Sequence, residues 1–333
     1  MRFLILGGTA WLGATIAMAA RYHGHQVTCL ARGETGSVPD GIRFVPGDRT
    51  RSDVYDSVAA EEWDVVVDVS RQPGQVASAV AALRERAGSY TFVSSGNVYA
   101  ETSTPGGLES AELVGALAGD VMEDMESYGE AKVACERRVL EGFGPERSLI
   151  LRSGLIGGPG DVSDRSGYWP ARFAQPAADD GSVLVPDVPG LLTQLLDVRD
   201  LAEWIVDAAE DGTRGVYNVA GETVSLVEYL AVARFVAGHT ARVVGVDPHW
   251  LQEHGVEPWS GPRSLPLWLP LPEYGGFSAR DTSAARNAGL VTRPLADTLA
   301  DTLRWERQRV LNGPRRAGLS DADEVALLAA LAA

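Results

Sequence analysis

Short apolar runs alternate with longer helical patterns along the first half of the chain. Runs typical of strands buried on both faces lie at Arg2–Leu6, Gln26–Ala31, Ile42–Val45, Asp64–Val69, Tyr90–Ser94 and Ser148–Leu151. Apolar residues with helical spacing occupy the intervals, at Trp11–Tyr22, Ser52–Ala60, Gln75–Ala87 and Ser127–Leu140. This alternation predicts successive strand–helix–strand units, and therefore an α/β fold in which a parallel sheet carries helices on both faces.

The pattern changes after Leu151. Segment 157–190 is rich in Gly, Pro and Asp, and segment 256–276 is irregular and rich in Pro and Trp. Beyond these we predict helices at Asp200–Glu210, Ser225–Ala237, Asp297–Arg309 and Asp321–Leu331 (the last capped by Ser320), a strand at Gly215–Val219, and a linker at Asn312, Gly313 and Pro314. We therefore expect a sheet domain made of residues 1–156 and about 196–221, with a smaller C-terminal cap made of about 157–195 and 222–333.

Composition narrows the class of protein. The chain has 333 residues and a formal net charge of −16, which argues against binding to nucleic acid. No apolar run approaches the ~18 residues of a membrane span, and nothing near Met1 resembles a cleaved leader, so we expect a cytoplasmic protein without membrane contact. Two cysteines cannot build a disulfide framework.

A glycine-rich loop follows the first predicted strand. Its residues are Gly7, Gly8, Thr9, Ala10, Trp11, Leu12 and Gly13. Glycines let the backbone turn sharply and approach a pyrophosphate, and the helix N-terminus behind them offers free N–H groups. We therefore interpret the sheet as a Rossmann-type doubly wound sheet whose loop binds a dinucleotide. A tight turn that needs glycine only for its geometry is the structural alternative.

The next strand ends add polar side chains at the same edge. The second strand ends at Ala31 and Arg32, where NAD-binding sites commonly carry an acid for the ribose 2′-hydroxyl. A guanidinium pairs with a 2′-phosphate, so Arg32 favours NADP(H), with NAD(H) still possible; a solvated arginine is the alternative. The third strand is followed by Asp48 and Arg49, and the fourth by Ser70. From their position alone we predict that all three contact the cofactor and that Asp48 binds the adenine amino group.

The strongest chemical signal is a tyrosine four residues before the only lysine of the chain. Tyr128 and Lys132 share one face of a helix, whereas the other 28 basic residues are arginines. An ammonium near a phenol stabilises the phenolate, which suits proton transfer at neutral pH. At the end of the fifth strand, Ser94 and Ser95 offer a hydroxyl for a substrate carbonyl. Such a set beside a nicotinamide is typical of hydride transfer; a surface i,i+4 pair is the alternative.

These residues together resemble the extended short-chain dehydrogenases/reductases, which include sugar-nucleotide epimerases and dehydratases. The resemblance covers nearly the whole chain and rests on the glycine loop, Ser94–Tyr99, Tyr128–Lys132, Arg152–Gly160, Asp197–Ala202 and Arg293–Leu295. It implies that Tyr128 is the acid/base, that Ser95 is the catalytic serine with Ser94 beside the cofactor, and that Lys132 orients the ribose.

The same resemblance places Ser153, Leu155 and Ile156 at the nicotinamide end, and it makes a homodimer an expectation. The chain also departs from the family pattern. Ala10 replaces the middle glycine of the loop, and Ser153 replaces a usual proline. Gly96 and Asn97 follow Ser95 where the dehydratases carry Asp-Glu, which argues against dehydration.

In the cap, Asp164–Arg172 is the most distinctive segment. Arg165, Tyr168, Trp169 and Arg172, together with Asn97, are candidates for binding an anionic or aromatic substrate. Packing of the aromatic residues between cap and core, with solvated arginines, is an equal alternative. Trp250, Trp259 and Trp268 likewise either line an apolar pocket or only pack the cap. Segment Glu109–Glu126 is either a lid, with Met122 and Met125 facing substrate, or a contact with the core or with a second subunit.

Three hypotheses of function follow. The leading one is an NADP(H)-dependent oxidoreductase that transfers hydride to or from a small carbonyl compound or alcohol, with Tyr128 as acid/base. The second is a sugar-nucleotide epimerase with tightly bound NAD, which Arg32 disfavours. The third is a non-catalytic regulator or RNA-binding relative, which the Ser–Tyr–Lys set and the acidity disfavour.

His23 and His25 resemble a metal pair, but they close a helix and enter a strand, so we interpret them as structural and expect no catalytic metal.

Overall fold

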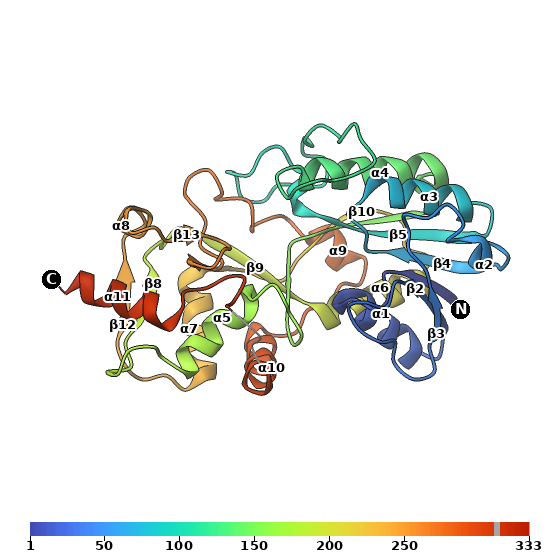
Figure 1. Ribbon diagram of the computed structural model, residues 1–333. Coiled ribbons are helices and arrows are strands. Elements are labelled where there is room, and N and C mark those ends of the chain that lie inside the picture. Colours follow the sequence, from blue (N-terminus) through green and yellow to red (C-terminus); the bar gives the residue numbers. More distant parts are fainter. Residues whose placement is uncertain (310–313, 333) are drawn as a thin grey trace.

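The computed structural model describes residues 1–309 and 314–332, and its centre is a seven-stranded parallel sheet (Figure 1). The strands run in the order β10-β6-β5-β4-β1-β2-β3, and all neighbours pair in parallel. They are β1 (Arg2–Leu6), β2 (Gln26–Ala31), β3 (Arg43–Pro46), β4 (Trp63–Asp68), β5 (Ala87–Ser95), β6 (Ser148–Ser153) and β10 (Gly215–Val219). The order reverses at β1 and β4, so the predicted doubly wound sheet is confirmed, with its switch point beside the glycine loop.

Helices cover both faces of this sheet. One face carries α1 (Trp11–Tyr22) and α6 (Val198–Glu210), and the other carries α2 (Asp56–Ala59), α3 (Pro73–Leu83) and α4 (Tyr128–Phe143) (Figure 1). Successive residues of β1 alternate between the two cores, Phe3 and Ile5 facing α1 and α6, and Leu4 and Leu6 facing the others. No helix among the described residues is long and apolar enough to cross a membrane.

The cap forms a second lobe with its own apolar core. Its strands are β7 (Leu155–Gly157), β8 (Val183–Pro186), β9 (Leu192–Asp197), β11 (Thr223–Ser225), β12 (Val243–Val246), β13 (Glu257–Pro258) and β14 (Ser264–Leu265). Its helices are α5 (Arg165–Ala174), α7 (Leu226–Ala237), α8 (Pro248–Glu253), α10 (Leu295–Gln308) and α11 (Asp321–Leu331), while α9 (Ser283–Asn287) returns to the first lobe, where Ala285 is buried in the core. Ser320 caps α11 as predicted. Of the predicted linker, Asn312 and Gly313 lie outside the described residues.

Two helices of the first lobe differ from their predictions. The pattern over Ser52–Ala60 folds as turns with only Asp56–Ala59 helical. The helix predicted at Gln75–Ala87 begins earlier, at Pro73, because proline is well suited to the first helical turn. It ends at Leu83, and Ala87 instead begins β5 by pairing with Trp63 of β4.

Candidate functional site

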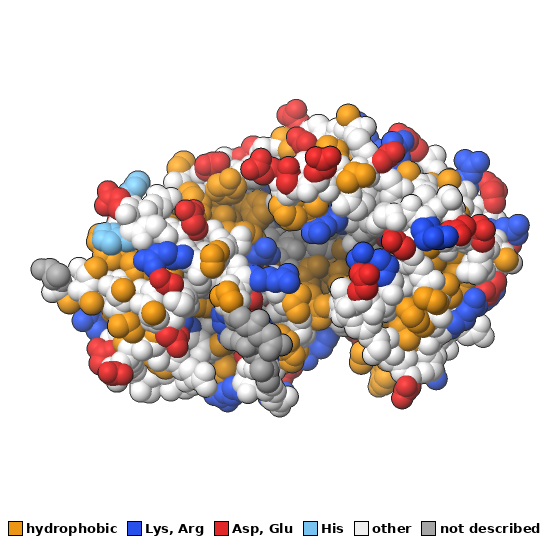
Figure 2. All heavy atoms as spheres, in the orientation of Figure 1, with side chains coloured by type: hydrophobic (Ala, Val, Ile, Leu, Met, Phe, Trp, Pro, Cys, Tyr) orange, Lys and Arg blue, Asp and Glu red, His pale blue; other side chains and the backbone are white. Residues whose placement is uncertain are grey.

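The carboxyl ends of the parallel strands line a crevice. Two cavities of about 490 Å³ and 450 Å³ form it, and they share Val69 and Arg71, which follow β4. The larger one lies against β1, β2 and the glycine loop, and the smaller one lies between α4 and the cap. Figure 2 shows the surface hollowed between the two lobes, with basic side chains gathered at the edge. A ligand with two chemically different halves would fit this arrangement.

The glycine loop builds the floor of the larger cavity. Gly7 adopts a φ of +95°, which a residue with a side chain rarely tolerates. A methyl group on Gly8 would collide with the Cys29 thiol, and one on Gly13 would collide with the carbonyl oxygen of Gly7. No side chain caps the N-terminus of α1 at Ala10, and no acidic residue lies in its first turn. The free N–H groups and the dipole of α1 therefore suit a pyrophosphate, and the tight cradle fits a dinucleotide.

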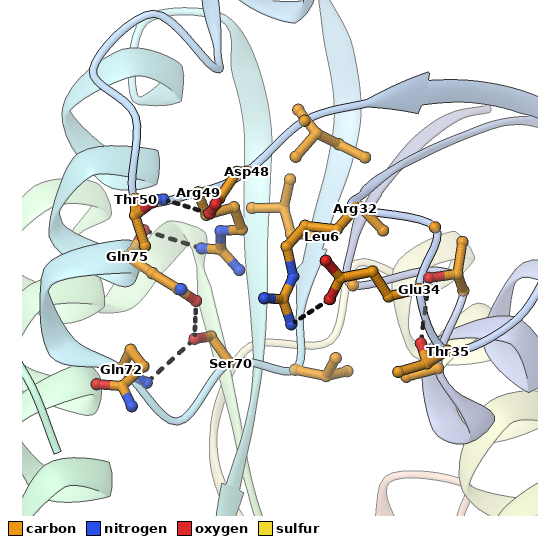
Figure 3. A pocket seen from close by; sticks show the side chains of 18 of the residues that line it. Leu6, Arg32, Glu34, Thr35, Asp48, Arg49, Thr50, Ser70, Gln72 and Gln75 are labelled. Carbon is orange, nitrogen blue, oxygen red and sulfur yellow. Dashed lines mark hydrogen bonds and ion pairs between the residues drawn. The ribbon is translucent and has the colours of Figure 1, made fainter. Parts of the chain in front are cut away.

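The outer end of the larger cavity carries the predicted strand-end groups (Figure 3). Arg32 Nη2 lies 3.2 Å from Glu34 Oε2, and both side chains are more than half exposed. The Asp48 carboxylate accepts from the backbone N–H of Thr50, and this hydrogen bond lowers the pKa of Asp48. Arg32 and Asp48 thus both line the cavity as predicted. The ion pair between Arg32 and Glu34 was not predicted from the sequence.

Arg49 forms a buried ion pair at the larger cavity. Its guanidinium is buried and donates to both carboxylate oxygens of Asp68 at 2.7 Å and to the Tyr55 hydroxyl at 2.8 Å. Burial alone would raise the pKa of Asp68, but the Arg49 guanidinium lowers it below the ordinary value. Arg49 lines the larger cavity as predicted, but its guanidinium donors are occupied within the protein, so its role as a cofactor contact stays a prediction.

The smaller cavity brings Ser95, Tyr128 and Lys132 together. Tyr128 is the first residue of α4, and Lys132 lies one turn later with its Nζ 5.9 Å from the centre of the Tyr128 ring. The Lys132 ammonium donates to the carbonyl oxygens of Ser70 and Val93, each at 2.7 Å. Because an ammonium has three donors, one remains for the crevice.

The serines around this cavity differ in what they contact. Ser95 Oγ donates to Asn97 Oδ1 at 3.0 Å, and both residues line the cavity. Ser153 Oγ is buried and has no hydrogen-bond partner among the described residues, which suits a ligand atom, and Leu155 and Ile156 lie beside it. The predicted cofactor contact Ser94 is instead buried, donating to Glu136 Oε1 at 2.5 Å.

Of the four residues of segment Asp164–Arg172 that were predicted to contact substrate, one lines the smaller cavity. Arg165 lines the smaller cavity. Tyr168 and Trp169 are buried in the cap core, and Arg172 forms ion pairs with Asp321 and Glu324 of α11. These three therefore hold cap elements together, which corrects their assignment to substrate.

The remaining candidates divide between cavity and core. Ala10, Thr9 and Ser70 line the larger cavity, and Trp11, whose indole N–H donates to the Pro159 carbonyl at 2.9 Å, lines the smaller one. Leu12 and Gly13 lie behind the loop and line neither cavity. Trp259 and Met125 line the smaller cavity, whereas Trp268 and Met122 are buried and Trp250 packs on the cap core.

Sequence reasoning missed several cavity residues. Arg71 and Gln72 follow the predicted contact Ser70, so the strand-end rule could have included them. Phe277 comes from a Pro-rich segment without periodicity, and no local signal points to it.

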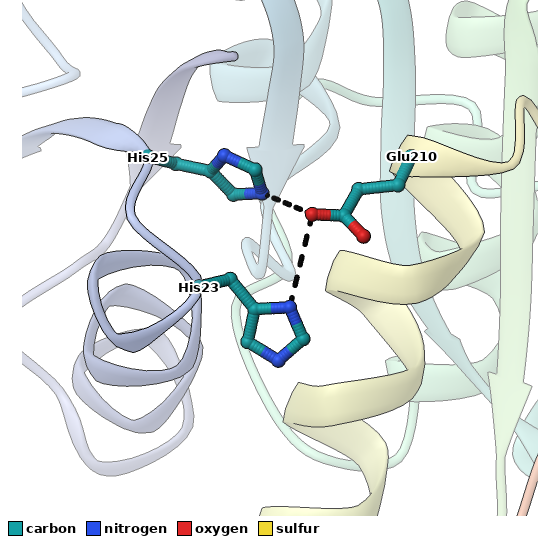
Figure 4. Close-up of side chains that lie close together, drawn as sticks. All are labelled: His23, His25 and Glu210. Carbon is teal, nitrogen blue, oxygen red and sulfur yellow. Dashed lines mark ion pairs between the residues drawn. The ribbon is translucent and has the colours of Figure 1, made fainter.

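His23, His25 and Glu210 form a cluster at the amino end of the sheet, opposite the crevice (Figure 4). Glu210 Oε1 lies 2.7 Å from His25 Nε2 and 3.7 Å from His23 Nδ1, and Glu203 contacts His23 Nε2 at 2.9 Å. These contacts join α1 and β2 to α6. The ligating atoms lie close enough to hold a metal ion, but the cluster is remote from the Ser–Tyr–Lys set.

Comparison with known proteins agrees with this geometry. The model of the NAD dependent epimerase/dehydratase family matches residues 3–220. A 2′-dehydrokanamycin reductase from Streptomyces kanamyceticus is 29% identical over 55% of this chain, and the match spans only 53% of that protein. A 3-diazoavenalumate denitrifying reductase from a Streptomyces species is 25% identical over 86% of this chain and 92% of that protein. The structure of UDP-glucuronic acid 4-epimerase from Bacillus cereus in complex with NAD is 16% identical, with a TM-score of 0.66 over 92% of this chain and 99% of that one, and supports the fold.

Proposed function

Because the chain belongs to the NAD dependent epimerase/dehydratase family, we propose that it is an NADP(H)-dependent oxidoreductase acting on the carbonyl or alcohol group of a small organic molecule. The observation that carries this proposal is the meeting of Ser95, Tyr128 and Lys132 in one cavity beside the dinucleotide cradle. The two reductases among its relatives favour net reduction.

Tyr128, Ser95 and Lys132 each have a separate role in a carbonyl reduction. When bound, a reduced nicotinamide dinucleotide would supply the hydride, and the glycine loop would hold its pyrophosphate. The Tyr128 hydroxyl gives its proton to the carbonyl oxygen, which becomes the alcohol oxygen. The Ser95 hydroxyl turns from Asn97 Oδ1 and donates its hydrogen bond to the same oxygen as negative charge develops there. Lys132 stabilises the phenolate that remains, and its third donor would hold the ribose of the bound cofactor.

Arg32 supports NADP(H) as the cofactor. Its guanidinium stands at the end of β2 and lines the larger cavity, where a 2′-phosphate would lie. Glu34 competes for the same guanidinium, but the pair is exposed and therefore weak. A 2′-phosphate carries more charge than one carboxylate and would displace it.

The alternative is a sugar-nucleotide epimerase, which the fold of the UDP-glucuronic acid 4-epimerase favours. An epimerase returns the hydride to its substrate and keeps its NAD bound, so it would purify with nicotinamide and oxidise no added NADPH. A non-catalytic relative would retain its biological role without the Tyr128 hydroxyl.

The experiment is NADPH oxidation with a panel of aldehydes and ketones, followed by Tyr128→Phe. We expect kcat to fall by about 10²- to 10⁴-fold, because the proton donor is lost. Tyr22→Phe is the matched control, since Tyr22 is 88% exposed on α1, and it should retain full activity. An unchanged rate in Tyr128→Phe would refute the proposed role.

A further inference from the structure

Arg165 projects into the smaller cavity without an anionic partner. It is the first residue of α5 and half-buried, and its Nε is fully buried with no hydrogen-bond partner among the described residues. No carboxylate in the described ranges lies within ion-pair distance of its guanidinium, although most buried charges in proteins are paired. Burial lowers the pKa of Arg165 from its ordinary value, as expected for a cation that lacks a counterion.

The acidic residues nearest in sequence are already occupied. Asp161 also lines the cavity, but its carboxylate accepts from the backbone N–H groups of Ser163 and Ser166 and from the Ser166 hydroxyl. Asp164 forms ion pairs with Arg309 and Arg315. Both neighbouring carboxylates therefore have partners within the protein, and the Arg165 guanidinium stays available to a ligand.

An aromatic wall holds this guanidinium in place. The Arg165 Cζ lies 5.2 Å from the centre of the Trp259 ring, and the Trp259 ring packs edge-on against Phe277 with centroids 5.7 Å apart. A cation–π contact with an indole uses none of the N–H donors of the guanidinium. Trp259 itself has a φ of +68°, an uncommon conformation for so bulky a residue, and strain of this kind gathers at ligand sites.

We propose that Arg165 binds a carboxylate carried by an aromatic carbonyl substrate, whose ring lies against Trp259 and Phe277 while its carbonyl group reaches Tyr128. This inference rests on the proposed function and adds the substrate class. Arg71 and Lys132 also line the cavity, so cationic groups outnumber the single Asp161 there, in a chain with a net charge of −16. An anionic substrate would thus meet a local positive site.

The test compares 4-carboxybenzaldehyde with 4-formylbenzamide, its neutral analogue, in NADPH-dependent reduction by the full chain. We expect kcat/KM to favour the carboxylate by at least about tenfold, because charge-assisted bonds to a guanidinium are lost with the amide. Arg165→Gln should remove that preference through KM, and Arg165→Lys should restore part of it. Arg307→Gln, an exposed arginine of α10, is the matched control and should keep the preference.

A second measurement does not depend on turnover. Terephthalate binding in the presence of NADP⁺, followed by calorimetry, should weaken by about 10- to 100-fold in Arg165→Gln. If terephthalate binds through Arg165 but no carbonyl compound is reduced, the carboxylate site stands and the proposed function fails. If both benzaldehydes are reduced equally through Tyr128, the function stands and the carboxylate site is refuted. Competition by UDP, or an equal rise in the KM for NADPH in Arg165→Gln, would also refute it, because the anion would then belong to a nucleotide or to the cofactor.

Discussion

The pair formed by Arg32 and Glu34 allows a quantitative test of cofactor choice. Its two side chains are 58% and 63% exposed and lie 3.2 Å apart, so the pair contributes about 0.2–1 kcal/mol. A 2′-phosphate must displace Glu34 from Arg32, and that energy opposes NADPH binding. Glu34→Gln should therefore tighten NADPH binding by about 1.4- to 5-fold.

Removing the guanidinium has the opposite and larger effect. Charge-assisted bonds between Arg32 and the 2′-phosphate contribute about 1.5–3 kcal/mol, so Arg32→Gln should weaken NADPH binding by roughly 10- to 100-fold. NADH lacks that phosphate, and its affinity should change by less than about twofold.

The assay is titration of each variant with NADPH and with NADH at low and at high salt. Both effects should shrink at high salt, because exposed charges are screened. Arg84→Gln, an exposed arginine at the end of α3, serves as control. If Arg32→Gln leaves the ratio of NADPH to NADH affinity unchanged, the 2′-phosphate does not lie at Arg32 and the assignment of NADP(H) loses its basis.

Two further predictions concern stability. Glu136→Gln should lower the free energy of unfolding by about 3–5 kcal/mol in urea denaturation, because it leaves the buried Arg152 guanidinium without a counterion; a loss below about 1 kcal/mol would contradict this. The Glu203 hydrogen bond raises the pKa of His23, so the charged form is favoured in the folded state. Stabilisation is then complete below the unfolded pKa of about 6.5 and is lost as the pH rises through the higher folded value. The Tm difference between wild type and Glu203→Gln, measured with EDTA, should therefore shrink from pH 5.5 to 8.5, and a constant difference would argue against it.

The parallel sheet and the meeting of Ser95, Tyr128 and Lys132 in one cavity were predictable, because both depend on local signals. Strands buried on both faces read as continuous apolar runs, and carboxyl strand ends meet at one edge of a parallel sheet. Tyr128 and Lys132 are one helical turn apart, so their shared face follows from helix geometry alone. Spacing alone could not show what the two adjacent serines contact. Both are buried, and the long-range partner Glu136 takes the Ser94 hydroxyl, whereas Ser95 lines the smaller cavity.

The cap was less predictable, because its elements are short and its contacts are long-range. Helix α5 contains Pro170, which weakens the helical pattern, and β8 lies in the Gly- and Pro-rich segment 157–190. Arg165 and Arg172 are both arginines of helix α5. They differ only in that α11, about 150 residues later, supplies acids to Arg172 and none to Arg165. That distinction cannot be read from local sequence.

The lone lysine also has a mechanical consequence. Its ammonium ties the backbone after β4 to that of β5, and the segment after β4 borders both cavities. One tetrahedral cation thereby couples the end of the crevice at the glycine loop to the end at Tyr128, so that ordering either end restrains the other. A planar guanidinium offers its donors in a single plane, which explains why a chain that otherwise relies on arginine keeps an amine at this junction.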